Sequence, residues 1–293
     1  MVKDIFRVTL AALSFPVATI LNCCKGIIKL PCGDGNKVRV GICVNPLGKS
    51  FDKVSVSEKE VLVNTIKELL SKSKMNTNKV VVSVPESLVF SKVMYFPIVS
   101  SAELASAIKW QSEQEVPLPI DEVDLSWTVI EKPKRKTGME KMSVFVVAMP
   151  KKESALLVDL LSLLGLEPVR AENETLALSR LFVVNKKITE RVTIVDVGSA
   201  NTKMVLLENG LLQSVFTSDN SGLAMSRALS VKFGLSVVDA EKYKRTYGLD
   251  KNQLEGKVFA GIETIVSGLV DFNLGGGCFF CFCIDNWRSV FLF

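Results

Sequence analysis

The residues best suited to chemistry lie in a short polar turn between two apolar runs, Ile194-Val195-Asp196-Val197-Gly198-Ser199-Ala200-Asn201-Thr202-Lys203. A buried strand would bring Asp196 to its end, facing a cleft and not the core, and a tight turn of glycine and small hydroxyl residues would follow. Such a turn can aim backbone N–H groups at a phosphate, with Ser199 and Thr202 as hydroxyl donors, while Asp196 holds a hydrated Mg²⁺ through water. An ordinary hairpin with a polar turn explains the same residues, and the motif alone favours it, because short motifs are weak indicators.

Composition excludes several other kinds of chemistry. The chain of 293 residues contains no histidine, which excludes Ser-His and Cys-His catalysis and zinc–histidine sites. Carboxylates, lysine, backbone amides or a bound cation must carry any reaction. The seven cysteines lie between Cys23 and Cys43 or between Cys278 and Cys283. The pair Cys278-x-x-Cys281 has no fourth ligand at a usual spacing, so we expect no structural zinc.

Charge and the N-terminal residues bear on partners and location. A net charge of +5 with interspersed signs is too mild for a nucleic-acid-binding face. The uncharged run Val8 to Cys24 follows Lys3 and Arg7, as in a short signal sequence. However, Pro16 interrupts this run, no small-x-small cleavage site follows, and a spanning helix needs ~20 residues. We therefore expect a cytoplasmic protein with an N-terminal extension over residues 1–16.

Strand and helix patterns alternate along the chain in an order typical of an α/β protein. The expected strands cover residues 17–21, 37–44, 79–84, 89–96, 125–131, 142–149, 193–196, 202–207 and 213–217. Capping boxes at Ser57–Glu60 and Ser100–Glu103 predict the starts of two helices. Further helices are expected at residues 153–164, 172–184, 223–233 and 237–247. The tail 272–293 shows no helical period, and we expect it to be poorly packed.

In this context the sequence resembles the actin-like ATPase superfamily, and specifically the type IV pilus assembly family known as PilM. The turn after Asp196 is similar to the second phosphate loop of that superfamily. The stretch Val84 to Asp124, with Ala107-Ile108-Lys109-Trp110 and Val116-Pro117-Leu118-Pro119, is similar to the family's most distinctive region. That region is an inserted subdomain, called 1C, that the cell-division relative FtsA also carries. The resemblance runs from about Lys37 to Asp271.

The resemblance implies a fold and a division of the chain. The expected fold is an α/β, actin-like, two-lobed ATPase fold with an inserted small α+β subdomain of the 1C type and an incomplete C-terminal lobe. Nucleotide is expected between the lobes. The implied parts are a first, 1A-like lobe (17–78 and 150–190), the 1C-like insert (79–149), a second lobe (191–271) and an atypical tail (272–293).

The resemblance also implies ATP and Mg²⁺ as cofactors and assigns residues to them. Asp196, Gly198, Ser199 and Thr202 are assigned to the phosphates and Mg²⁺. Asn220-Ser221-Gly222 resembles the glycine turn beside the phosphates, so Ser221 and Gly222 join the expected nucleotide site. Glu241 and Lys244 match positions near the ribose and adenine, although a solvated helix face would give the same spacing.

Two departures from the family pattern weaken the expected nucleotide site. The best match to the first phosphate loop is Asn22-Cys23-Cys24-Lys25-Gly26-Ile27-Ile28-Lys29. Asn22 replaces a carboxylate that would hold hydrated Mg²⁺, and Cys24 crowds a turn made for glycine. The family also continues past Asp271 with a glycine-rich adenosine loop, whereas Gly275-Gly276-Gly277 comes too early. We expect weak or undetectable ATP binding and no turnover above background.

Three functions remain open from the sequence. The first is a cytoplasmic pilus-assembly scaffold that binds the cytoplasmic tail of a PilN-like inner-membrane protein, between the main lobe and the insert. It would lie at the inner membrane through that partner and contact other pilus assembly proteins, with homo-oligomers left open. The second is an ATP-hydrolysing or phosphotransferring enzyme on the same fold, since fold alone does not decide function. The third is a degenerate homologue without a nucleotide function.

Overall fold

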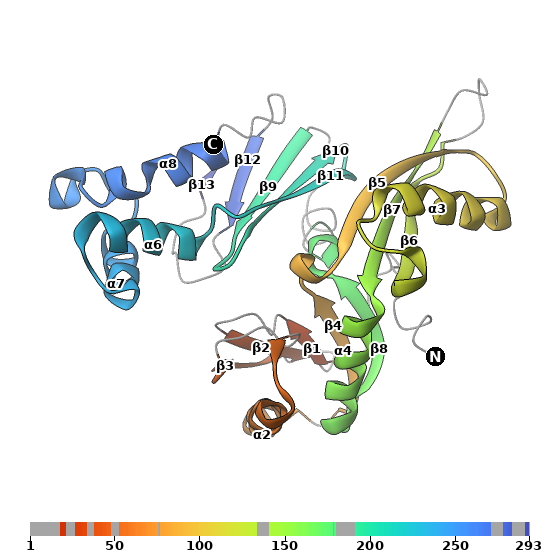
Figure 1. Ribbon diagram of the computed structural model, residues 1–293, viewed down its shortest axis with the longest axis horizontal. Coiled ribbons are helices and arrows are strands. Elements are labelled where there is room, and N and C mark those ends of the chain that lie inside the picture. The colour runs from red at the N-terminus through yellow and green to blue at the C-terminus, as the bar shows by residue number, and fades with distance from the viewer. Residues whose placement is uncertain are drawn as a thin grey trace. The chain divides into compact units, whose positions relative to one another are not determined.

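The computed structural model describes residues 18–21, 27–33, 38–47, 53–75, 77–133, 141–177, 179, 191–270, 278–282 and 291–292. The chain divides into two compact units, Met1–Leu181 and Phe182–Phe293 (Figure 1). Each unit contains a five-stranded sheet, and the first also contains a sheet of three strands. Both five-stranded sheets begin with three antiparallel strands followed by a parallel one.

The five-stranded sheet of the first unit has the order β3-β2-β1-β4-β8. Its strands are β1 (Ala18–Leu21), β2 (Ile27–Gly33), β3 (Val38–Val44), β4 (Lys79–Val84) and β8 (Glu167–Asn173). The first three strands form an antiparallel meander, and β4 runs parallel to both β1 and β8. Parallel pairing requires crossover connections, which here contain helices.

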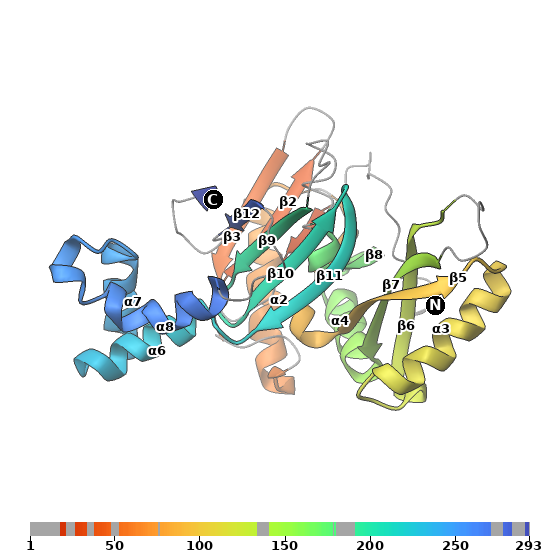
Figure 2. The same cartoon turned by 90° about the horizontal axis from the view of Figure 1, so that it is seen from above.

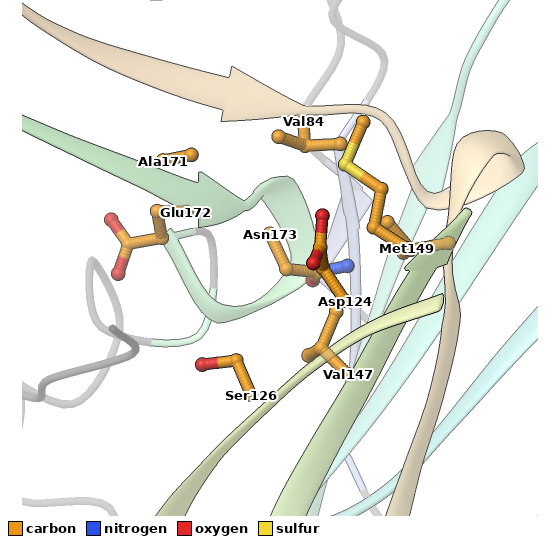
Figure 3. Close-up of a pocket in the computed structure, with 9 residues that line it drawn as sticks. Val84, Asp124, Ser126, Val147, Met149, Ala171, Glu172 and Asn173 are labelled. Atoms are coloured by element: carbon orange, nitrogen blue, oxygen red, sulfur yellow. The ribbon is translucent and has the colours of Figure 1, made fainter. Parts of the chain in front are cut away.

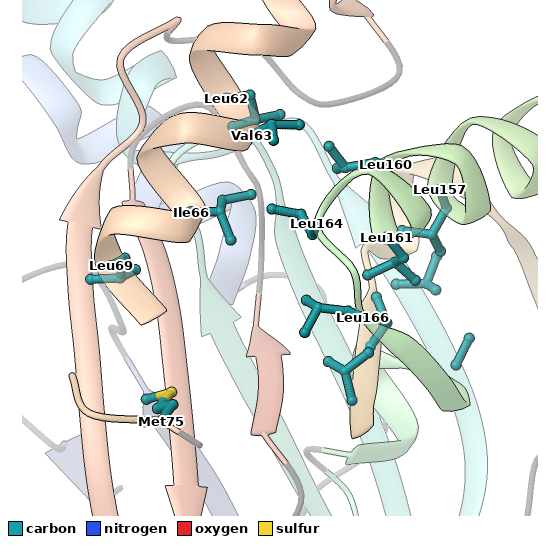
Figure 4. Packing of buried hydrophobic residues seen from close by; sticks show 14 of the residues in the cluster. Leu62, Val63, Ile66, Leu69, Met75, Leu157, Leu160, Leu161, Leu164 and Leu166 are labelled. Carbon is teal, nitrogen blue, oxygen red and sulfur yellow. The ribbon is translucent and has the colours of Figure 1, made fainter. Parts of the chain in front are cut away.

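Helices α2 (Val56–Lys72) and α4 (Lys151–Leu163) pack together beside this sheet (Figure 4). Their apolar stripes include Leu62, Ile66 and Leu161, which are almost fully buried, as the period of 3.6 requires. The capping box of α2 is formed by Ser55 and Glu58, so the helix begins earlier than predicted. The Glu58 carboxylate accepts from the Ser55 amide at 3.0 Å, a bond that Ser57–Glu60 was expected to make.

The three-stranded sheet has the order β5-β7-β6 and is antiparallel throughout. It comprises β5 (Phe90–Pro97), β6 (Val123–Glu131) and β7 (Lys141–Pro150), with short 3₁₀ turns η2 (Glu86–Leu88) and η3 (Ile120–Glu122) before β5 and β6. Helix α3 (Ser101–Glu115) covers one face (Figure 2), and its predicted capping box, Ser100 with Glu103, is confirmed. Strand β4, predicted within the insert, lies instead in the five-stranded sheet.

The sheet of the second unit has the order β11-β10-β9-β12-β13. Its strands are β9 (Arg191–Val197), β10 (Thr202–Glu208), β11 (Leu211–Ser218), β12 (Cys278–Phe282) and β13 (Phe291–Leu292). Helices α6 (Gly222–Phe233), α7 (Val237–Tyr247) and α8 (Phe259–Val270) form one layer beside it, with η4 (Gln253–Gly256) between α7 and α8 (Figure 2). Met204, Leu229 and Ile262 are central to the shared core.

Two segments differ from the sequence prediction. The helix expected from residue 172 begins only after Asn173, because Ala171, Glu172 and Asn173 continue the ladder with Val82, Ser83 and Val84 as part of β8. The tail, for which no structure was predicted, supplies β12, which pairs in parallel with β9. A short strand that joins a parallel pair far along the chain carries no local turn signal, which explains both misses.

Candidate functional site

The β9–β10 hairpin places an acid and a base directly opposite each other. Asp196 pairs with Lys203 in the antiparallel register, so both side chains lie on the same face of the sheet. Lys203 Nζ lies 3.2 Å from Asp196 Oδ2, and each side chain is only 7% exposed. Asp196, predicted to face a cleft, is therefore buried and ion-paired within the second unit. Its other oxygen, Oδ1, is buried and has no hydrogen-bond partner among the described residues.

The turn between these strands has a geometry that requires glycine at position 198. The Gly198 amide donates to the Asn201 carbonyl at 3.0 Å. A Cβ at position 198 would lie only 2.7 Å from that same oxygen, so any larger residue would displace the turn. Ser199 is exposed, and within the described chain no backbone carbonyl accepts from the amides of Ser199, Ala200 or Asn201. These donors can serve an anion.

Helix α6 begins against this turn. The amides of Gly222 and Leu223 donate to the carbonyls of Gly198 and Ser199, at 3.0 and 2.9 Å. The Thr202 hydroxyl donates to the Asn220 carbonyl at 2.5 Å. The Ser221 hydroxyl caps the helix by accepting from the Ala224 amide. The predicted residues of both turns therefore meet. The Thr202 hydroxyl joins the two turns, and the Ser221 hydroxyl caps α6.

Glu241 and Lys244 on α7 reach the same place. Lys244 is 4% exposed, and its ammonium group donates to Gly222 O at 2.7 Å, Ser226 Oγ at 3.0 Å and Glu241 Oε2 at 2.6 Å. Burial alone would raise the pKa of Glu241, but hydrogen bonds from Lys244, Ser226 and Arg245 outweigh burial and lower that pKa. The solvated helix face considered from the sequence is wrong for Lys244, which ties α7 to the start of α6.

The first phosphate loop falls largely outside the described residues. Asn22 lies there, and Lys29 is described only as a backbone position in β2. Lys29 is opposite Leu21 in the β1–β2 register, whereas Lys203 is opposite Asp196 itself. The two hairpins thus place their lysines differently relative to the strand that precedes them.

A second candidate site is a pocket in the first unit, between the ends of the two sheets (Figure 3). Its apolar lining comes from β4, β7, β8 and the residue after η2: Val84, Val147, Met149, Ala171 and Val89. Its polar lining comes from β6 and β8: Asp124, Ser126, Glu172 and Asn173. The cavity is small, about 10 Å³, and it is partly open to solvent. The sequence indicated a groove between main lobe and insert but not these residues, because only the fold brings β6 and β8 together.

A buried carboxylate lies directly behind this pocket. Glu86 is buried, and its Oε2 accepts from Asn173 Nδ2 at 2.7 Å and Thr175 Oγ1 at 2.6 Å. The Ser91 hydroxyl also donates to Glu86. These donors satisfy the hydrogen bonds of the carboxylate but leave its charge in place.

The two five-stranded sheets, each with an antiparallel meander followed by a parallel strand, are those of the actin-like ATPase fold. The match extends to a specific family. A family model described as "Type IV pilus assembly protein PilM" matches residues 35–263, and the chain belongs to that family.

Solved structures agree in fold. The chain is similar to a structure titled "PilM-PilN type IV pilus biogenesis complex", with a TM-score of 0.75 and 21% identity over 93% of this chain and 82% of that one. Weaker similarity extends to MreB5 of Spiroplasma citri bound to AMPPNP, with a TM-score of 0.48, 13% identity and coverage of 89% and 78%. In the parts of the chain that the structure describes, no helix is long and apolar enough to cross a membrane.

Proposed function

We propose that this chain is an actin-like scaffold of type IV pilus assembly that binds the cytoplasmic N-terminal tail of a PilN-type inner-membrane protein. Membership of the PilM family and the similarity to a PilM–PilN complex support the pairing. In this proposal the protein works in the cytoplasm, is held at the inner membrane by that tail, and contacts other pilus assembly proteins.

The observation that carries the proposal is the pocket between the two sheets of the first unit. Strands β6 and β8 line it, and each is an edge strand of its sheet among the described strands. An extended peptide adds to strand edges through main-chain hydrogen bonds and gains specificity by inserting side chains into pockets. The apolar walls of Val84, Val89 and Met149 would contact the end of such a side chain.

Filling the pocket tests this proposal. Ser126 lines the pocket and is partly exposed, so Ser126→Phe should block it without a large strain on the fold. Ser106→Phe, on the exposed surface of α3, is the matched control. In fluorescence anisotropy with a labelled PilN tail peptide, we expect Ser126→Phe to abolish binding and Ser106→Phe to leave it unchanged. Equal binding by both variants would place the tail elsewhere. Deleting residues 79–149 is a poorer test, because it removes β4 from the first sheet.

We further propose that the β9–β10 turn binds ATP–Mg²⁺ weakly and that the chain does not turn ATP over above background. The unpaired Oδ1 of Asp196 and the close-packed Gly198 suit a hydrated cation and a phosphate. Ser199 would donate through its amide and hydroxyl, while Thr202, Ser221, Gly222, Glu241 and Lys244 would hold the turn in shape. When bound, the metal would neutralise phosphate charge; Asn22 and Lys29 belong to the other, altered loop.

Titration calorimetry with ATP–Mg²⁺ tests this second part. Asp196→Asn keeps a hydrogen-bond acceptor for Lys203 and removes the charge that would hold Mg²⁺ through water. Glu263→Gln, at an exposed position on α8, is the control with the same change in charge. We expect weak heat from the parent chain, none from Asp196→Asn and parent-like heat from Glu263→Gln. Micromolar affinity that survives Asp196→Asn would contradict the assignment.

A further inference from the structure

The carboxylate of Asp124 lies inside the pocket, and only one of its two oxygens accepts a hydrogen bond from the described residues. The residue is 7% exposed, and Figure 3 shows its side chain directed between Met149 and Asn173. The Ser154 hydroxyl lies 2.6 Å from Oδ2 and 3.0 Å from the Lys151 carbonyl. No side chain in the described ranges donates to Oδ1.

The surroundings of Asp124 are acidic. Glu172, which is 5% exposed, lines the same pocket. Glu86 lies behind Asn173, and its bonds come from the neutral side chains of Asn173, Thr175 and Ser91. Among the described residues, no lysine or arginine forms an ion pair with Asp124 or Glu86. Asp124 and Glu86 are therefore two buried carboxylates without a counter-charge among the described residues. Such burial is costly, so the pocket favours a cation.

We propose that this pocket recognises a basic side chain, lysine or arginine, on the extended partner segment. The inference rests on the proposed function of the pocket and adds the chemistry of what enters it. The cavity admits little more than one water molecule, so only the charged end of the basic residue enters it. The methylene stem packs against the half-buried Val89, as long cationic side chains commonly do against apolar surface. Its charged end donates to Asp124 Oδ1. Neighbouring apolar residues of the segment then add buried apolar surface, and the buried charge pair provides specificity.

A double-mutant cycle between chain and peptide tests the pair. The probe is the N-acetylated, fluorescein-labelled tail peptide of the PilN protein from the same organism, so that side chains are its only cations. Each lysine is changed singly to norleucine and each arginine to citrulline. The protein variant is Asp124→Asn in the full chain, which keeps an acceptor for Ser154. Asp121→Asn, an exposed acid in η3, is the matched control.

The expected result is specific to one basic position. Breaking one partner of a buried charge pair should weaken binding by about thirtyfold or more, both for Asp124→Asn and for one neutral peptide. The two changes together should weaken binding no further, and Asp121→Asn should bind as the parent does. Equal affinities for Asp124→Asn and Asp121→Asn would overturn the proposal. So would a neutral peptide whose affinity Asp124→Asn still lowers thirtyfold.

Two further measurements keep the outcomes distinct. If Asp124→Asn does not fold, the peptide series alone decides. If none of the neutralised peptides binds the parent chain more weakly, the pocket does not recognise a basic side chain. Ser126→Phe separates this inference from the function of the pocket. Binding lost in Ser126→Phe but kept in Asp124→Asn overturns only the basic side chain, whereas binding kept in Ser126→Phe overturns the location of the tail.

Discussion

Each unit of this protein buries an aspartate beside a candidate site, but the fold compensates the two charges differently. Asp196 in the second unit forms an ion pair with Lys203, and both side chains are 7% exposed. Asp124 in the first unit is similarly buried, but among the described residues its carboxylate is bonded only by the hydroxyl of Ser154. The first charge is compensated within the chain, and the second has no counter-charge in the described part of it.

The difference originates in strand register. Asp196 and Lys203 lie seven positions apart and directly opposite across a hairpin, so the turn that forms the strands also forms the pair. Asp124 lies opposite Met149 in the β6–β7 ladder, which offers no charge. A locally encoded ion pair stabilises its own turn, whereas an isolated buried acid reduces stability and gains it back when a cation binds. The comparison therefore separates a residue with a structural role from one suited to recognition.

The largest expected effect is the loss of the internal ion pair. Asp196→Ala leaves the ammonium of Lys203 buried without the Asp196 carboxylate, which should lower the free energy of unfolding by about 3–5 kcal/mol. Asp124→Asn removes an uncompensated buried charge and should change stability by less than about 1 kcal/mol, in either direction. Chemical denaturation of both variants checks this order. A destabilisation by Asp124→Asn as large as that by Asp196→Ala would show that both charges are compensated.

Lys244 should rank next, because it joins α7 to the start of α6. Lys244→Met keeps the volume of the stem but removes the hydrogen bonds to Gly222, Ser226 and Glu241. Charged hydrogen bonds contribute roughly 1.5–3 kcal/mol each, but contributions within one network do not add. Because Glu241 keeps its bonds from Ser226 and Arg245, we expect a loss of about 3 kcal/mol. Lys242→Met, on the exposed side of the same helix, should change stability little. Thermal melting of Lys244→Met and Lys242→Met compares the two positions. Similar melting temperatures would mean that the Lys244 hydrogen bonds contribute nothing to stability.

Much of the second unit could be predicted because its signals are local. The β9–β10 hairpin, the capping serine at 221 and the α7 range follow from turn residues and period within short windows. The same sequence could not show that Thr202 and Lys244 use their polar atoms inside the site, because their partners, Asn220 and Gly222, are distant along the chain.

The first unit shows where sequence patterns fail. The pocket combines β4, β6, β7 and β8. The last two residues of β8, Glu172 and Asn173, were taken for the start of a helix because they carry no strand signal. Parallel pairing with β4 decides their conformation, and tertiary pairing of this kind overrides local propensity. Neither Asp124 nor Glu86 therefore stood out as a buried acid until the sheets were in place.

A smaller effect should follow from crowding the phosphate turn. Gly198→Ala places a Cβ 2.7 Å from the Asn201 carbonyl oxygen, so the turn must shift at a cost of roughly 1–2 kcal/mol. Gly234→Ala tests backbone conformation alone, since its φ is +63° and no atom lies within 4 Å of the added Cβ. Both variants should be destabilised, but only Gly198→Ala should also lose the weak heat of ATP–Mg²⁺ in calorimetry. Loss of that heat in both variants would contradict the proposal that ATP–Mg²⁺ binds at the Gly198 turn.

The smallest expected effect is a dependence of stability on acid that belongs to Glu241. Hydrogen bonds from Lys244, Ser226 and Arg245 overcome the effect of burial and lower the pKa of this carboxyl group in the folded state. The unfolded chain, with a glutamate pKa of about 4.3, then binds more protons than the folded chain as the pH falls from about 5. The stabilisation from Glu241 is fully present at pH values above the pKa of the unfolded chain. It is lost as the pH falls through the lowered pKa of the folded state.

Because Glu241 is about one-third exposed, solvent screening should limit its contribution to less than about 1 kcal/mol. Urea denaturation of the parent and of Glu241→Gln between pH 3 and 6 measures it. The variant should be less stable than the parent at neutral pH, and the difference should shrink toward zero in acid, because protonation removes the same charge that the substitution removes. Glu263→Gln, an exposed carboxyl on α8, should follow the parent at every pH. A constant difference between Glu241→Gln and the parent would mean that packing, and not the charge network around Lys244, accounts for the role of Glu241.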